Sequence, residues 1–188
     1  MSALTQIQKR IQAHTPAVQQ DAQLTRAAVL IPLIGGKDEL ELLFTVRTDD
    51  VEHHKGQISF PGGSIEASDD SLEATALRET HEELALKTEH IEILGRIDDM
   101  WTPTGYIVTP FVGFIQELPV LSPQPSEVSD FFTVPLAYFL DESNGYTREY
   151  SRGGESMDVW FYDYGRYTIW GVTAFIIRNF KAILENSA

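Results

Sequence analysis

The chain has 188 residues, 43% of them apolar, which suits one compact domain with a substantial core. Its 14 basic and 28 acidic residues give a formal charge of -14, which argues against binding to nucleic acid or to an anionic membrane. Because cysteine is absent, disulfides, thiolate metal sites and thiol nucleophiles are excluded. Carboxylates and five histidines remain as metal ligands, and oxygen ligands favour Mg²⁺ or Mn²⁺.

The first part of the chain predicts a helix, a hairpin and a second helix. Residues 3–13 predict a short amphipathic helix that ends before Thr15-Pro16, so we expect a helical extension over residues 1–25 and the main domain over 26–188. No run of about 18 apolar residues and no secretory signal are visible, which predicts a cytoplasmic protein. The predicted elements that follow are an antiparallel pair of strands at 27–33 and 40–46, a short strand at 57–60 that Pro61-Gly62-Gly63 ends, and a helix at 71–86.

The second part adds strands and a last helix. We expect no regular structure in residues 118–130, a polar stretch with three prolines that is long enough to be functional. The other predicted elements are strands at 91–97, 107–115, 159–162 and 167–170 and a helix at about 171–184. Because helices and strands do not alternate regularly, the pattern predicts an α+β fold with a mixed sheet between helices.

Three carboxylates fall on one face of the predicted helix 71–86. At about 100° of rotation per residue, Glu79, Glu82 and Glu83 lie within roughly 100° of one another. Like charges at this spacing weaken a helix by about 0.2–0.5 kcal/mol per pair, so a divalent cation is a natural partner. Arg78 can hold Glu82 in a forked pair. Taken alone, this run is more typical of a solvated acidic surface.

The surrounding residues change that interpretation. The stretch from Gly63 to Leu86 resembles the Nudix box, whose usual form is G-x5-E-x7-R-E-U-x-E-E-x-G-U with U a bulky aliphatic. It departs from that form in three ways. One extra residue precedes Arg78, which puts Asp69 or Asp70 in the acidic position, Thr80 replaces an aliphatic residue, and Ala85 replaces a glycine. Alanine resists positive φ, so the last change could strain the turn.

The segment before the box narrows the resemblance. Residues 42–48 and 54–63 resemble the segment that precedes the box in the coenzyme A pyrophosphatase branch, which also tolerates the extra residue and the Asp. Residues 169–173 are similar to a segment near the end of those proteins. Glu52 departs from the branch, because a basic residue commonly stands there. The resemblance implies a Nudix-type α/β/α sandwich and cleavage of the diphosphate of coenzyme A or acyl-coenzyme A to 3',5'-ADP and (acyl) 4'-phosphopantetheine.

By this resemblance, the box supplies the metal site. Glu79 and Glu83 are the expected ligands of Mg²⁺ or Mn²⁺, Glu82 shares or supports them, and the carbonyl near Gly63 completes the shell. Asp69 or Asp70 could anchor the loop, while Asp70 could equally be a helix N-cap or a first-turn carboxylate. The expected catalytic residues are Glu82, Arg78 and the candidate base Glu127, which could also be an ordinary loop acid.

The expected substrate-binding residues are Arg47, His54, Gln57 and Tyr106. Arg47 is the basic residue best placed for an anionic substrate, and a histidine at position 54 could bind phosphate. Tyr106 could stack on a base or a pantetheine arm, or simply pack. The alternatives are another nucleoside diphosphate derivative as substrate, such as ADP-ribose, a dinucleotide or a nucleoside triphosphate, or a ligand-binding module without turnover. The sequence leaves the oligomeric state open, a homodimer included.

Overall fold

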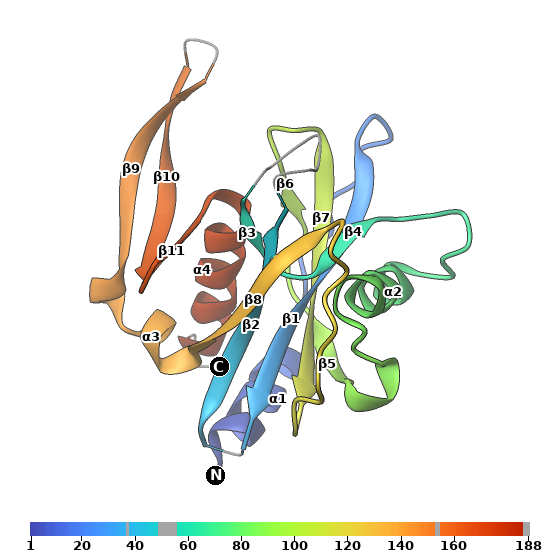
Figure 1. The fold of residues 1–188 in the computed structure, drawn as a ribbon. Coiled ribbons are helices and arrows are strands. Elements are labelled where there is room, and N and C mark those ends of the chain that lie inside the picture. The colour runs from blue at the N-terminus through green and yellow to red at the C-terminus, as the bar shows by residue number, and fades with distance from the viewer. Residues whose placement is uncertain (37, 49–55, 153–154, 186–188) are drawn as a thin grey trace.

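The computed structural model describes residues 1–36, 38–48, 56–152 and 155–185. An eight-stranded mixed sheet forms its centre (Figure 1), with strand order β3-β2-β1-β7-β5, β4 and β6 paired to β1 and β7, and β8 paired to β2. β1 and β7 are parallel and the other pairs are antiparallel. The strands are β1 (Thr25–Gly35), β2 (Leu40–Arg47), β3 (Ile58–Ser59), β4 (Gly62–Ser64), β5 (Glu92–Arg96), β6 (Met100–Trp101), β7 (Tyr106–Ile115) and β8 (Val128–Pro135).

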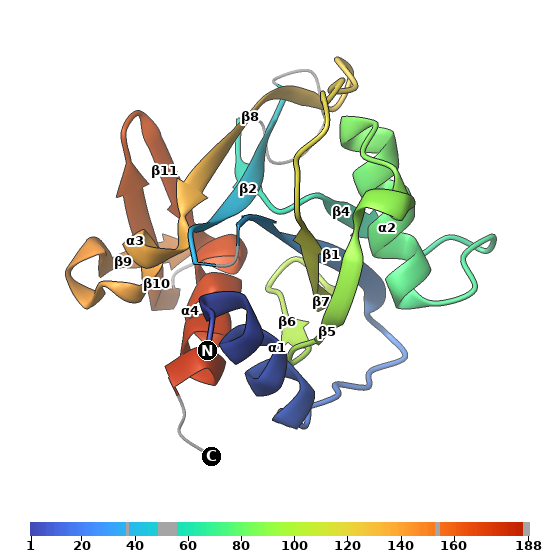
Figure 2. The same ribbon diagram turned by 90° about the horizontal axis from the view of Figure 1, so that it is seen from below.

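Helices cover both faces of this sheet (Figure 2). α2 (Leu72–Leu84) packs on one face, where Ala28 and Leu30 of β1 share a buried cluster with Ala76. α1 (Ala3–Ala13) and α4 (Gly171–Glu185) cover the other face, where Ile31 and Leu33 belong to the largest cluster. Alternate side chains of β1 therefore enter two cores, which explains its nearly continuous apolar sequence. The predicted fold, a mixed sheet between helices, is confirmed.

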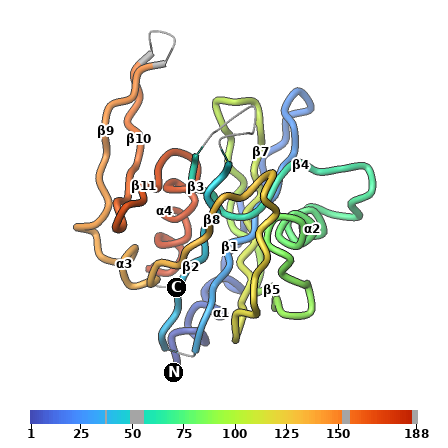
Figure 3. Tube along the Cα trace, in the orientation of Figure 1, coloured from blue at the N-terminus to red at the C-terminus, as the bar shows by residue number. Residues whose placement is uncertain are grey.

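A second, three-stranded sheet lies on the outer side of α4 (Figures 1 and 3). It has the order β11-β10-β9, and the β9–β10 hairpin projects beyond the main sheet. Its strands are β9 (Gly145–Arg152), β10 (Glu155–Tyr164) and β11 (Tyr167–Trp170), and the remaining short elements are α3 (Leu136–Leu140) and the 3-10 turns η1 (Thr88–His90) and η2 (Glu142–Asn144). Tyr162 packs edge-on against Phe139 at 5.2 Å between ring centroids, which ties this sheet to α3.

The prediction of no regular structure in residues 118–130 is wrong at its end. Val128 to Asp130 begin β8, which pairs along β2 from Arg47 to Glu41. The polar residues Ser129 and Asp130 hide the strand in the sequence, because β8 lies at the edge of the sheet and needs few apolar side chains at its start. β9 and α3 were not predicted either, because β9 is polar at nearly every position apart from Tyr146 and Tyr150 and α3 is only five residues long.

Candidate active site

Local sequence signals place α2 where its carboxylates meet the sheet. The Ser71 hydroxyl accepts a hydrogen bond from the Ala74 backbone N–H at 3.1 Å, so Ser71 is the N-cap. Of the alternatives considered for Asp70, the N-cap and the first-turn carboxylate are therefore wrong, because Asp70 precedes the N-cap. The helix ends at Leu84, and Ala85 adopts a left-handed conformation with φ 55°, the only positive φ of a non-glycine residue among those described. Ala85 thus holds the conformation for which the box has glycine, and the expected strain is present.

Three carboxylates converge beside the glycine turn. One oxygen each of Glu79, Glu83 and Glu127 lies within 4.8 Å of the others. Glu79 and Glu83 come from α2, whereas Glu127 comes from the loop before β8. The Glu82 carboxylate is half-exposed and bound to Arg78, outside this group. Glu127 was expected as a base, and the structure brings it to the two expected metal ligands.

The glycines of β4 allow this approach. A Cβ on Gly63 would stand 2.3 Å from Glu79 Oε1, so the carboxylate occupies the space that any side chain at position 63 would need. Gly62 has φ 155°, and a Cβ there would stand 2.3 Å from the Ala28 carbonyl oxygen. The Gly62 backbone N–H faces the Glu83 carboxylate closely enough to lower its pKa. The backbone of the Pro61-Gly62-Gly63 turn therefore lies directly against the carboxylates of Glu79 and Glu83.

Arg78 organises the polar side of the helix. Its Nε and Nη2 donate to the two oxygens of Asp69 at 2.9 and 3.0 Å, a forked pair, and Nη2 also donates to the Ser64 carbonyl at 3.1 Å. Its Nη1 donates to Glu79 at 3.1 Å and to Glu82 at 2.9 Å.

These contacts settle which aspartate anchors the loop. The Arg78 guanidinium, the Glu66 backbone N–H and the Thr75 hydroxyl hold the pKa of Asp69 well below its usual range. Asp69, with 4% of its side chain exposed, is therefore the loop anchor, and Asp70 is exposed.

The cluster of Glu79, Glu83 and Glu127 is the carboxylate group of this site, and its negative charges outnumber the positive charges that act on it. Glu83 is 2% exposed, and burial, reinforced by Glu79 and Glu127, raises its pKa to about 8 in spite of Arg47 and the Gly62 N–H. Burial likewise raises the pKa of Glu79, against the effect of Arg78. Glu83 Oε2 is buried without a hydrogen-bond partner among the described residues. An all-oxygen set with an orphaned buried oxygen and raised pKa values fits a divalent cation.

The expected substrate-binding residues have different positions. Arg47, at the end of β2, lies near enough to Glu83 to lower its pKa, and its buried Nε has no partner among the described residues. The Gln57 carbonyl accepts from the Arg47 N–H at 3.0 Å. Tyr106 is 37% exposed at the start of β7, beside Thr25, and no stacking of its ring is found in the described part of the chain. His54, Glu52 and the other residues from 49 to 55 lie outside the described residues.

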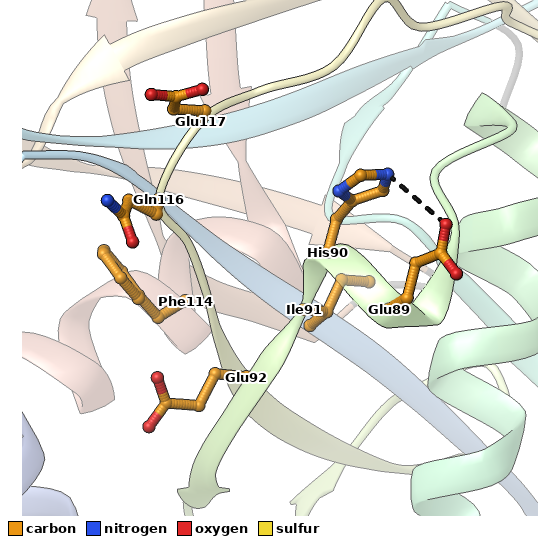
Figure 4. Close-up of a pocket in the computed structure, with 7 residues that line it drawn as sticks. All are labelled: Glu89, His90, Ile91, Glu92, Phe114, Gln116 and Glu117. Atoms are coloured by element: carbon orange, nitrogen blue, oxygen red, sulfur yellow. Dashed lines mark ion pairs between the residues drawn. The ribbon is translucent and has the colours of Figure 1, made fainter.

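A separate surface pocket lies away from these carboxylates (Figure 4). Ile91 and Phe114 form its apolar part, and Glu89 forms an ion pair with His90 at 3.9 Å. None of the residues that line it belongs to the carboxylate group or to the Arg78 network, so the pocket is separate from the candidate active site.

Comparison with known proteins identifies the family. The model of the NUDIX domain matches residues 24–160. The chain belongs to the Nudix family. It is 40% identical over 153 residues to a protein from Photorhabdus laumondii named "Uncharacterized Nudix hydrolase NudL", with 81% of each chain covered. A NudL protein of Enterobacter sp. is 39% identical over 90% of this chain and 88% of its own. The predictions of a Nudix protein and of a hydrolase are therefore confirmed.

Solved Nudix structures show the same fold at low identity. A MutT/nudix family protein from Enterococcus faecalis matches with a TM-score of 0.56 and 18% identity, covering 99% of this chain and 71% of its own. RenU, a Nudix hydrolase from M. smegmatis, matches with a TM-score of 0.51 and 18% identity, covering 61% and 72%. Nudix hydrolases generally use divalent cations and small nucleotide-derived substrates, in keeping with the carboxylate group of this chain. No described helix is long and apolar enough to cross a membrane.

Proposed function

We propose that this Nudix hydrolase cleaves the diphosphate of coenzyme A or acyl-coenzyme A, with Mg²⁺ or Mn²⁺, to 3',5'-ADP and 4'-phosphopantetheine or its acyl form. The hydrolytic activity is supported by one observation: carboxylate oxygens of Glu79, Glu83 and Glu127 lie within 4.8 Å of one another, beside Gly63. The coenzyme A part is supported by the resemblance of residues 42–48 and 54–63 to that branch. Arg47, whose charge lowers the pKa of Glu83, supplies a cation near the site for an anionic substrate.

Each polar residue of the site then has a task. Glu79 and Glu83 would hold the cation from α2, with Gly63 beside Glu79 and the carbonyl near Gly63 as a further candidate ligand. When bound, the cation supplies neutralisation of phosphate charge and an activated water. Arg78 fixes Glu79 and Glu82 through its Nη1, so Glu82 is a supporting carboxylate. Glu127 faces the pair from the loop and is the candidate acceptor for the proton of the attacking water. Arg47 offers positive charge to a substrate phosphate.

A panel of diphosphate substrates tests this proposal. Coenzyme A, an acyl-coenzyme A, ADP-ribose, a dinucleoside polyphosphate and a nucleoside triphosphate are incubated with the purified protein and Mg²⁺ or Mn²⁺, and products are identified by mass. We expect 3',5'-ADP and 4'-phosphopantetheine from coenzyme A. Hydrolysis of ADP-ribose or a triphosphate with coenzyme A left intact would keep the hydrolase and reject the coenzyme A assignment. Binding without turnover of any of these substrates would instead support a ligand-binding module, which the intact Glu79, Glu82 and Glu83 oppose.

A further inference from the structure

The loop that carries Glu127, residues 118–127, is fixed to the end of α2. The Gln124 N–H donates to the Glu83 carbonyl at 2.9 Å, and the Ser122 N–H donates to the Leu84 carbonyl at 3.0 Å. Carbonyls in the last turn of a helix have no donors within the helix, so the loop satisfies them. The backbone of metal-ligand candidate Glu83 is thereby joined to the loop three residues before Glu127.

A second anchor holds the other end of the loop. Thr48, directly after β2 and 6% exposed, donates its backbone N–H to the Glu127 carbonyl at 3.0 Å. Its hydroxyl donates to the Ser126 carbonyl at 3.1 Å. One buried residue therefore binds the backbone of Glu127 and of the residue before it.

The side chain of Glu127 has no such support. In the part of the chain that the structure describes, its carboxylate accepts no hydrogen bond and forms no ion pair. Among the described residues, only the backbone of the loop sets its location beside Glu79 and Glu83. A displacement of about 1 Å in a catalytic group can cost about 100-fold in rate, so the backbone anchors matter for chemistry.

We propose that Thr48 is a positioning residue for Glu127, and that its hydroxyl keeps the Glu127 carboxylate in the metal and water site. This inference rests on the proposed hydrolytic function. A purely structural role for the Thr48 hydroxyl would lower stability without acting through Glu127. The two roles differ in whether the effect of changing Thr48 depends on the presence of the Glu127 carboxylate.

A double-mutant cycle between Thr48→Val and Glu127→Gln separates these roles. For the four proteins of the cycle, kcat and KM are measured with the best substrate of the panel, and Mn²⁺ affinity is measured by calorimetry without substrate. Thr48→Ser restores the hydroxyl. Thr80→Val is the matched control, because Thr80 is also buried and its hydroxyl donates to a carbonyl of its own helix, that of Ala76, and not to the loop of Glu127.

We expect Thr48→Val to lower kcat by about 10- to 100-fold with a KM change below about 3-fold, and to cost almost nothing further in the Glu127→Gln background. Thr48→Ser and Thr80→Val should stay within about 3-fold of the wild type. An equal loss in both backgrounds, or wild-type kcat in Thr48→Val, overturns the proposal. If Thr48→Val does not fold, Thr48→Ala takes its place in the cycle. If no diphosphate is cleaved, the proposed function fails, while the Mn²⁺ cycle still tests the coupling.

Discussion

The burial of the Glu83 carboxylate suits metal binding but lowers the stability of the metal-free fold. It is 2% exposed, faces two other carboxylates, and has one oxygen without a partner among the described residues. Glu83 could be predicted as a ligand from the resemblance to the box, but its burial arises from the packing of α2 on β1 and β4, which the periodicity of the helix could not specify. A buried carboxylate near other carboxylates is tolerated when a cation binds there, so the protein without metal should carry an electrostatic cost.

Glu83→Gln should therefore abolish hydrolysis and stabilise the metal-free protein. We expect kcat to fall by at least about 1,000-fold, as for loss of a metal ligand worth several kcal/mol. The free energy of unfolding in the presence of EDTA should rise by about 1–3 kcal/mol at pH 8. Urea unfolding and a steady-state assay measure these changes, and Glu73→Gln, an exposed position in the first turn of the same helix, is the control.

The pH dependence of this stability follows from the direction of the pKa shift. The pKa of Glu83 is raised from 4.5 to about 8 in the folded protein. Below pH 4.5 the residue is protonated in both states and has no titration cost. Between these two values the unfolded state releases the proton more readily, so the stability of the wild type falls as pH rises. The advantage of Glu83→Gln should grow from pH 5 to pH 8 and then level off. An advantage independent of pH would show that packing, not charge, causes it.

Ala85 is the second residue at which the sequence conflicts with the local backbone. Its φ of 55° is costly for alanine and free for glycine, and Ala85 is exposed, so no packing is lost on substitution. We expect Ala85→Gly to raise the free energy of unfolding by about 0.5–1 kcal/mol. Ala74→Gly, inside α2, should lower it by a similar amount because glycine disfavours helix there. Denaturant midpoints measure both changes, and destabilisation by Ala85→Gly would refute the strain argument.

Among the helices and strands, those with a regular pattern of buried apolar side chains could be predicted from the sequence, and those without such a pattern could not. The hairpin of β1 and β2 and the helices α1, α2 and α4 carry a clear apolar pattern or caps, and the structure confirms them. β8 was missed because Ser129 and Asp130 at its start are polar and the segment before it contains three prolines, although its partner β2 fixes it in place. Glu127 could be found from the sequence, but its distance from α2 could not, because backbone hydrogen bonds to Glu83, Leu84 and Thr48 determine the path of its loop.

α1 was expected as part of an extension before the main domain, and its packing bears on that boundary. Ile7 and Ile11 are 5% and 3% exposed and share the largest hydrophobic cluster with β1 and α4. Ile11 also meets β5 closely, since a Cβ on Gly95 would lie 2.6 Å from its Cγ2 atom. The helix therefore closes one side of the core.

Ile11→Ala tests whether α1 contributes to the stability of the whole domain. We expect a loss of about 2–4 kcal/mol in the free energy of unfolding, in a single cooperative transition, because the substitution leaves a cavity in the shared core. Unfolding followed by tryptophan fluorescence and by circular dichroism should give coincident curves. Leu4→Ala, at a partly buried position of the same helix, should cost less. A wild-type midpoint in Ile11→Ala would mean that α1 is an independent extension.

At the scale of the whole molecule, the charge of -14 opposes the approach of an anionic substrate. The described site offers Arg47 as a local cation, while Arg78 is already engaged by carboxylates. The Debye length falls from about 30 Å at 0.01 M salt to about 8 Å at 0.15 M. Added salt should therefore screen the net repulsion before it weakens the short-range contacts inside the site, where charges are partly buried.

We accordingly expect kcat/KM for coenzyme A to rise by about 2- to 5-fold between 0.01 M and 0.15 M salt, with kcat nearly constant, since the effect is on encounter. The measurement uses a fixed, saturating free Mg²⁺ concentration and compares KCl with tetramethylammonium chloride, so that competition by a particular cation is recognised. The opposite trend, a fall of kcat/KM with both salts, would mean that local positive charge around Arg47 dominates the encounter. Attraction inside the site would then outweigh the repulsion by the acidic surface as a whole.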